Sequence, residues 1–183
     1  MRWTALRFAA FGIDVGLLAA ILVLPQAILG FGFGLSLFNL SGFADLLGIE
    51  AFVLLTVSLP SWLYFILGDA SAGGATIGKR ALRMRVVQVD GNRVSLPRVV
   101  LRTLVKMTPW ELTHTALLVP VPLFAAGAVP TLEQTIRLAL VYVVLFVQLG
   151  VIIKTEGTRG LHDLAARTRV LRLEGIQHRS SLE

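Results

Sequence analysis

The sequence contains no cysteine and few charged residues. Without cysteine, the chain has no disulfide scaffold, no thiol nucleophile and no thiolate to bind a metal. Charged residues make up 15% of the 183 positions, whereas hydrophobic residues make up 55%. Soluble domains carry about 25% charged residues. So apolar a chain cannot cover a large surface that faces water, and we expect a membrane protein.

Four long apolar runs carry this expectation further. They cover about residues 8–29, 49–67, 110–129 and 136–153. Each has roughly 18 to 22 residues, enough at 1.5 Å per residue to cross a hydrocarbon core of about 30 Å as a helix. The first run is too long for the core of a signal peptide and contains Asp14. We therefore predict an all-α membrane protein with a four-transmembrane-helix bundle, formed by residues 1–183 as one domain.

The distribution of lysine and arginine predicts the orientation. Sixteen of these 17 residues precede the first run or lie in the loop 69–108 or the tail 154–183, and Arg137 is the exception. The positive-inside rule then places both termini and this loop in the cytoplasm, as an even number of spans requires. In the outer loop, we expect a short interfacial helix at about residues 43–47.

The cytoplasmic segments carry signals for a small sheet. Residues 82–89 are partly alternating and β-branched, and Asp90-Gly91-Asn92 is a turn signal. We expect residues 93–96 to return as the second strand of a β-hairpin. In the tail, residues 161–166 predict a helical turn and residues 167–173 alternate basic and apolar side chains. The tail is therefore expected to add a strand to the sheet.

A basic stripe follows the predicted hairpin. Arg98, Arg102 and Lys106 recur at every fourth residue and so share one face of a helix. This pattern predicts an amphipathic interfacial helix whose cations face anionic lipid headgroups, together with Lys79 and Arg80. A partner protein is an alternative ligand for this basic face. In a second interpretation, the helix simply begins the third span and its arginines snorkel to the interface.

Asp14 is the most informative polar residue. It lies roughly six residues, or about 9 Å, inside the first run. An ionised side chain at the centre of a membrane helix costs about 2.5–3.5 kcal/mol, so Asp14 needs a partner or must titrate. Arg7 lies two turns earlier on the same face. If the tail folds back, His162 and Asp163 would approach Arg7 and form one charged network with Asp14.

Other polar residues occur in the third and fourth runs. Glu111 and His114 are three residues apart on one helix face, and Gln148 lies near the inner end of the fourth run. With Asp14 they predict a polar layer, which is either a proton or cation site or a hydrogen-bonded clamp that fixes helix packing. Two ligands make a weak case for a metal, and the sequence has neither GxSxG nor HExxH. We expect no enzyme, no cofactor, no metal and no nucleic-acid partner.

Three segments together resemble the RDD family of bacterial membrane proteins. They are RFAAFGIDVGLL at residues 7–18, GATIGKRALRMRVVQVDG at 74–91 and GLHDLAARTRVL at 160–171. By position, Arg7, Asp14 and Asp163 match the Arg, Asp and Asp that name the family. The resemblance implies a multi-pass protein of the bacterial cytoplasmic (inner) membrane. Members are described as transporters, some linked to sodium–proton exchange, and others resemble accessory proteins of membrane complexes.

Two functions remain open at this point. The first is a small ion transporter coupled to protons, similar to a cation–proton antiporter, which uses Asp14. Four short spans make a thin pore, so this function predicts a homo-oligomer. The second is a non-catalytic adaptor or regulator that recruits a membrane protein partner or anionic lipid through its basic cytoplasmic face.

Overall fold

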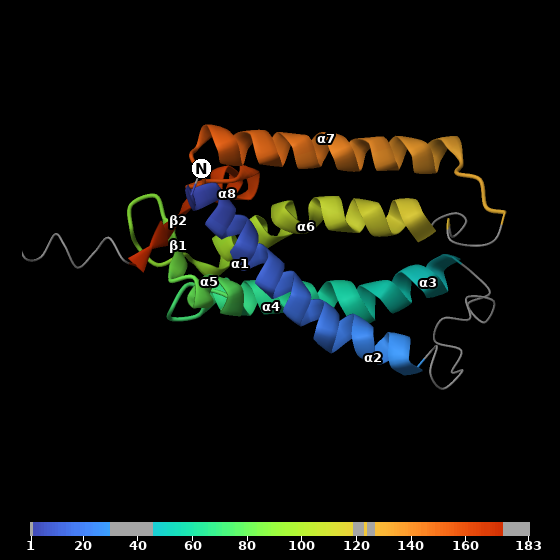
Figure 1. Ribbon diagram of the computed structural model, residues 1–183, viewed down its shortest axis with the longest axis horizontal. Coiled ribbons are helices and arrows are strands. Elements are labelled where there is room, and N and C mark those ends of the chain that lie inside the picture. The colour runs from blue at the N-terminus through green and yellow to red at the C-terminus, as the bar shows by residue number, and fades with distance from the viewer. Residues whose placement is uncertain (1, 30–45, 119–122, 124–126, 174–183) are drawn as a thin grey trace, which may run out of the picture. The chain divides into compact units, whose positions relative to one another are not determined.

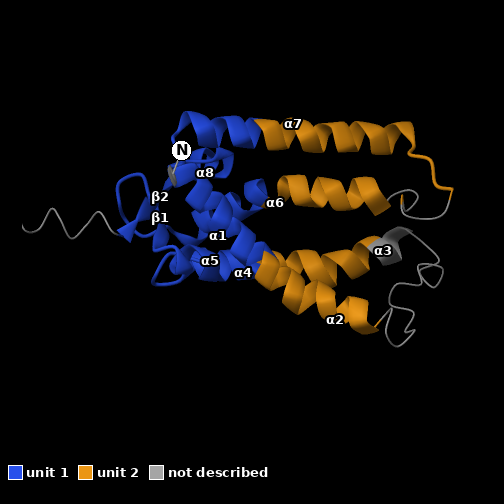
Figure 2. Cartoon of the chain, in the orientation of Figure 1, with its two compact units in different colours: residues 1–15, 63–106, 147–183 blue, residues 16–62, 107–146 orange. Residues whose placement is uncertain are grey.

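The computed structural model describes residues 2–29, 46–118, 123 and 127–173. The chain divides into two compact units (Figure 2). Unit 1 comprises residues 1–15, 63–106 and 147–183, and unit 2 comprises residues 16–62 and 107–146. Each unit therefore assembles segments that are far apart in the sequence.

The chain is mostly helical, as Figure 1 shows. Within the described residues, three helices are long and apolar enough to cross a membrane, and they correspond to the first, second and fourth predicted runs. The prediction of a membrane protein is confirmed at this level. The three spans are Trp3–Ala27, Glu50–Ala70 and Leu132–Lys154. The first contains α1 (Arg2–Leu18), η1 (Ala19–Val23) and α2 (Leu24–Ala27); the second α3 (Leu46–Val53), η5 (Leu54–Ser58) and α4 (Leu59–Ala70); and the third is α7 (Leu132–Lys154).

Two of these spans contain a π-helical turn, and both turns belong to unit 2. η1 ends two residues before Pro25, and η5 ends two residues before Pro60. Proline has no N–H to donate, and its ring clashes with the carbonyl four residues earlier, so a regular α-helical turn is unfavourable there. A wider turn relieves the clash without ending the helix. The two turns lie next to each other.

α6 (Leu96–Leu118) corrects the prediction of a separate interfacial helix. One continuous helix of 23 residues includes the basic stripe and the beginning of the third apolar run, as the second interpretation expected. Pro109 inside it does not end the helix. α6 is not among the three apolar spans, because it also carries the charges of the basic stripe. Much of the rest of the third run lies outside the described residues.

The sheet of unit 1 has two strands, β1 (Met84–Gln88) and β2 (Thr168–Arg172), which pair antiparallel. The tail therefore supplies a strand, as predicted, but the hairpin prediction is wrong. The backbone N–H of Gln88 donates to the carbonyl of Asn92 and closes a tight turn, and α6 begins at Leu96. Too few residues remain between this turn and α6 for a return strand, so β1 pairs with the distant β2.

Small apolar clusters support this sheet. Met84 and Val170 pack with Ala10 of α1, and Val86 packs with Val94 and Val99. Two short helices complete unit 1: α5 (Ile77–Ala81), beside β1, and α8 (Leu161–Ala166), beside β2, where the sequence predicted a helical turn.

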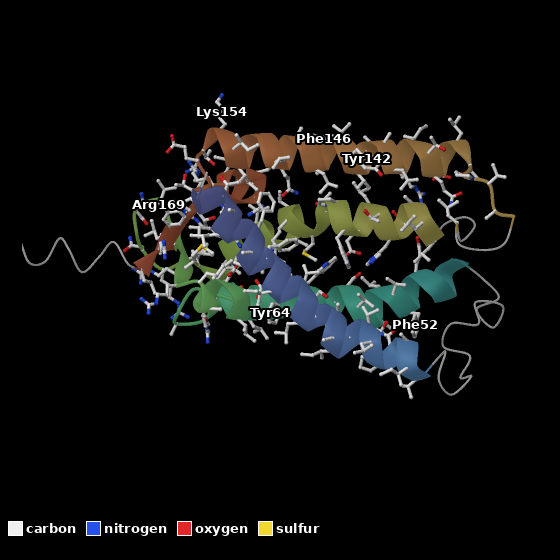
Figure 3. The ribbon with its side chains drawn as sticks, viewed as in Figure 1. Phe52, Tyr64, Tyr142, Phe146, Lys154 and Arg169 are labelled. Atoms are coloured by element: carbon white, nitrogen blue, oxygen red, sulfur yellow. The ribbon has the colours of Figure 1, made fainter. Side chains whose placement is uncertain are left out.

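The α7 segment of unit 2 exposes large apolar side chains. Tyr142 and Phe146, labelled in Figure 3, are 60% and 69% exposed. Such a surface is suited to lipid rather than to water. α3 begins at Leu46, and residues 43–45 of the predicted outer-loop helix lie outside the described residues.

Candidate functional site

Asp163 lies at the centre of a buried ion cluster in unit 1. It is in the first turn of α8, where its Oδ2 accepts a hydrogen bond from the N–H of Gly160 at 2.8 Å. Arg7 donates to the same oxygen at 2.7 Å. Arg102 Nε and the Thr168 hydroxyl both donate to Oδ1 at 2.9 Å. With four donors, this fully buried carboxylate is satisfied by protein groups alone.

The ion cluster continues through Arg102 to α4 and α5. Arg102 donates through Nη1 to Asp69, and the other oxygen of Asp69 accepts from Lys79. Five side chains thus alternate in sign, in the order Arg7, Asp163, Arg102, Asp69 and Lys79. Burial opposes the charge of Arg102, but the carboxylates of Asp163 and Asp69 both bind its guanidinium and offset this cost. For Lys79, burial outweighs Asp69 and lowers the pKa.

His162 lies against this chain of ion pairs. Its Nε2 is 3.1 Å from Arg7 Nη2 and 3.3 Å from Asp163 Oδ2. Burial outweighs the attraction of Asp163 and lowers the pKa of His162 to about 4. The ring is therefore neutral at pH 7, and its Nε2 accepts from Arg7. For Asp163, burial favours the neutral form, but the guanidiniums of Arg102 and Arg7 hold its pKa well below the usual range.

Asp14 is buried in a different way. Its Oδ1 accepts from the Tyr64 hydroxyl at 2.5 Å and from the backbone N–H of Gly78 at 2.7 Å, and its Oδ2 accepts from the Thr76 hydroxyl at 2.6 Å. Tyr64 comes from α4 and is labelled in Figure 3. Asp14 is 1% exposed, and no cationic side chain of the described residues lies within 4.0 Å of its oxygens. Neutral donors alone therefore hold this carboxylate.

Gly78 makes this arrangement possible. A Cβ at position 78 would lie 2.1 Å from the carbonyl oxygen of Ala10 and 2.9 Å from Asp14. Real Cβ atoms do not approach backbone that closely, so only glycine lets α5 come near enough to α1 for its N–H to reach Asp14. This contact explains the glycine in the Gly-Lys-Arg segment.

Lys106 of α6 has aromatic neighbours. Its Nζ lies 3.3 Å from the ring centroid of Phe65 and 4.7 Å from that of Phe11, which is the geometry of a cation–π contact. In the part of the chain that the structure describes, no carboxylate lies within 4.0 Å of this amine. Lys106 is thus the cationic counterpart of Asp14, a charged side chain without an ion pair.

We call the seven charged side chains of this region the charge cluster. Five form the alternating chain of ion pairs, and Asp14 and Lys106 have no ionic partner within it. All seven belong to unit 1. The members are Arg7, Asp14, Asp69, Lys79, Arg102, Lys106 and Asp163.

The structure corrects the expected role of two basic residues. Arg102 is 1% exposed and Lys79 is 8% exposed, and both pair with carboxylates, so they do not reach lipid headgroups. Arg80 is exposed and bonds the Ser71 hydroxyl, and Arg98 is half-buried and bonds Gln88. The four-residue spacing predicted a shared helix face correctly, but it did not tell whether that face meets lipid or protein.

The other predicted polar residues are divided between the units. In unit 2, Glu111 accepts from the Ser58 hydroxyl at 2.9 Å and from Trp62 Nε1 at 3.0 Å, and His114 Nδ1 lies 3.8 Å from Glu111. Gln148 belongs to unit 1, and its Nε2 is buried without a partner among the described residues. The polar layer expected to join these residues to Asp14 stays a prediction.

Three members of the site escaped the sequence analysis. Asp69, Tyr64 and Thr76 each contact the predicted residues, but none stands out in a hydropathy pattern. Asp69 could have been predicted from the sequence, because it is an acidic residue at the end of a span and next to a loop with many lysines and arginines. Such a residue is expected to form ion pairs. In the described ranges, no group of three or more His, Asp or Glu residues is placed to hold a metal ion.

Comparison with known proteins gives one match. The model of the RDD family matches residues 4–167, which includes every member of the charge cluster. No curated protein matches the chain, and no solved structure does.

Proposed function

This chain belongs to the RDD family, and we propose that it is a multi-pass transporter of a bacterial cytoplasmic membrane that exchanges a small cation for protons. The observation that carries the proposal is the environment of Asp14. This buried carboxylate lies in a membrane-spanning helix, yet only uncharged groups donate hydrogen bonds to it.

The oxygen atoms around Asp14 suit a small, hard cation. The Tyr64 hydroxyl lies 2.5 Å from one carboxylate oxygen of Asp14, and the Thr76 hydroxyl lies 2.6 Å from the other. Hydroxyl hydrogens rotate freely, so the same oxygens can turn from donors into ligands when a cation arrives. Hard cations prefer such oxygen ligands. Asp69 and Asp163 offer no comparable site, because fixed cations already occupy their oxygens.

The contacts inside unit 1 support four spans with both termini on the same side. Arg7 near the start of α1 contacts Asp163 beyond the end of α7. The chain between two residues at one face of a membrane crosses it an even number of times, so three apolar spans need a fourth, which α6 and the residues after it supply. The excess of basic residues at this end supports a cytoplasmic location.

Exchange in proteoliposomes tests the proposal. Purified protein is reconstituted with a pH gradient, and proton movement is followed on adding Na⁺, K⁺ or Li⁺. We expect at least one cation to dissipate the gradient, and Asp14→Asn to abolish the effect because it removes the charge that attracts the cation. Asp90→Asn is the matched control, since Asp90 lies in an exposed turn and bonds the N–H of Asn92.

Two results would overturn the proposal. One is exchange no faster than in protein-free liposomes for every cation. The other is full exchange in Asp14→Asn, which would remove this residue from the mechanism. Because four spans make a thin pore, we also expect the active form to be a homo-oligomer, and its mass in detergent measures this.

A second candidate function is a non-enzymatic adaptor that recruits an acidic partner protein. It is favoured by arginines on the sheet of unit 1: the Nε atoms of Arg85 and Arg169 are buried without a partner among the residues described (Figure 3 labels Arg169). For this role, we expect a stoichiometric partner that dissociates in Arg85→Glu, together with no exchange activity. Binding to anionic vesicles alone would instead indicate a lipid ligand. Neither function requires a cofactor.

A further inference from the structure

We propose that the amine of Lys106 is the group that gives up a proton when a cation binds at Asp14, and takes it back when the cation leaves. The inference rests on the proposed function for its physiological meaning. Lys106 is not one of the Arg and Asp residues for which the family is named. The inference assigns cation binding to Asp14 and proton release to Lys106.

The first argument is the surroundings of Lys106. Two phenyl rings contact its Nζ, whereas the other lysine of the charge cluster, Lys79, is paired with Asp69. The charged groups that act on Lys106 come from four elements: Asp14 from α1, Asp69 from α4, Lys79 from α5 and Arg102 from α6 itself. Aromatic faces stabilise a protonated amine but do not hold it as a carboxylate does, so the proton can leave.

The second argument is a charge balance. The charge cluster has four cationic and three anionic side chains. With Lys106 neutral, its sum is zero, and with Lys106 protonated, its sum is +1. A buried excess charge is unfavourable in a medium of low dielectric constant. A monovalent cation bound at Asp14 would raise the sum of the protonated cluster to +2, so cation binding favours the loss of one proton.

Lys106 is the member that can supply this proton. Arginines do not lose protons in proteins, which leaves Arg7 and Arg102 permanently charged. Lys79 is held by a carboxylate in its ion pair with Asp69, although burial lowers the pKa of this amine. The amine of Lys106 has two ring centroids at 3.3 and 4.7 Å as neighbours, and no carboxylate of the described residues lies within 4.0 Å to hold its proton.

This charge balance couples the binding of one cation at Asp14 to the release of one proton from Lys106. A monovalent cation that binds at Asp14 adds one positive charge to the cluster. Loss of one proton from the ammonium of Lys106, which becomes a neutral amine, restores the previous sum. The reverse step takes up a proton and releases the cation. No other bond is made or broken, and no further reactant is needed.

The titration of Lys106 tests the inference directly. The chain has only three lysines, at positions 79, 106 and 154. In the purified full-length protein, reductive methylation with ¹³C keeps each amine titratable and gives it an NMR signal, and Lys106→Arg assigns the signal of interest. We expect the midpoint of Lys106 to lie at least about one pH unit below the reference value of about 10.4 for a lysine amine in a model peptide.

The decisive comparison is the effect of the cation. Replacing choline chloride by NaCl, or by the cation active in proteoliposomes, should lower the midpoint of Lys106 in the wild type. Asp14→Asn should remove this effect. A Lys106 midpoint at the model-peptide reference value, or one that no cation changes, overturns the inference.

Exchange measurements separate this inference from the proposed function. Lys106→Arg keeps a cation over the rings but cannot release a proton, so exchange should fall at least about tenfold while the melting temperature stays near that of the wild type. Full exchange in Lys106→Arg overturns the role of Lys106 and leaves that of Asp14 intact. A cation-dependent titration in a protein without exchange would support coupled binding and overturn transport.

Discussion

Asp163 and Asp14 are both almost completely buried in unit 1, but different kinds of group bind their carboxylates. Two guanidiniums, a hydroxyl and a backbone N–H surround Asp163. Two hydroxyls and a backbone N–H surround Asp14, and no cation contacts it. Permanently charged guanidiniums bind Asp163. Two of the three donors to Asp14 are hydroxyls, whose hydrogens can rotate away from the carboxylate.

This difference separates a structural site from an exchangeable one. An ion pair between buried groups cannot release either partner without leaving an unpaired charge in a medium of low dielectric constant. A carboxylate that accepts from hydroxyls can exchange those hydrogen bonds for contacts to a cation, because the same oxygens stay in place. We therefore expect Asp163 to matter mainly for stability and Asp14 mainly for transport.

The largest expected effect is that of Asp163→Asn. The amide keeps the size of the side chain but leaves Arg7 and Arg102 buried with less negative charge. Breaking a buried pair in this way costs about 3–5 kcal/mol. Asp14→Asn alters hydrogen bonds without leaving a partner cation, so we expect about 1 kcal/mol. Unfolding by denaturant in detergent measures both, and equal losses for the two variants would contradict the comparison.

The second effect concerns the pH dependence around Asp163. Because the folded pKa of His162 is about 4 and the unfolded value is 6.5, the unfolded state binds more protons between these values. Stability from this group is fully present above about pH 6.5 and is lost as the pH falls towards 4, by about 3 kcal/mol in total. Melting temperatures from pH 7 to 4.5 should fall less in His162→Gln. An identical fall in both proteins would show that His162 is not buried in its neutral form.

The third effect isolates the neutral donors of Asp14. Gly78→Ala places a methyl group against the carbonyl of Ala10, so α5 must move away and the N–H bond to Asp14 lengthens. Overpacking of this kind costs about 1–3 kcal/mol. Gly12→Ala is the control on α1, because nothing lies within 4 Å of its added Cβ and alanine favours the helix. If both variants melt alike, α5 does not depend on this close approach.

Much of the fold was predictable from the sequence, for reasons that particular elements make clear. The length and hydropathy of the runs predicted three spans that the structure contains, because lipid requires a helix of a certain length. Alternation in the tail predicted β2, and the expected ion pair of Arg7 and Asp163 is present. Hydropathy and alternation are local signals. The ion pair was predictable because both ends of the chain were expected on the same side of the membrane.

The remainder depends on tertiary contacts that no local pattern encodes. A helix face that carries Arg102 can meet lipid or protein, and only the position of Asp69 and Asp163 decides between them. The partner strand of β1 lies about 80 residues later in the sequence, whereas the turn signal after β1 predicted a hairpin with the next segment. Tyr64 belongs to an apolar run, so its hydroxyl gave no sign of a polar partner.

The bond between Arg7 and Asp163 has a consequence for biosynthesis, because it joins residues separated by 156 positions. During translation, Arg7 and Arg102 leave the ribosome long before their shared carboxylate exists, so water or phospholipid has to accommodate them in the meantime. α8 and the strand that follows it thus complete a unit whose earlier segments have already been synthesised. A polypeptide that ends before position 163 leaves Arg7 without a carboxylate and Arg102 with Asp69 as its remaining carboxylate partner.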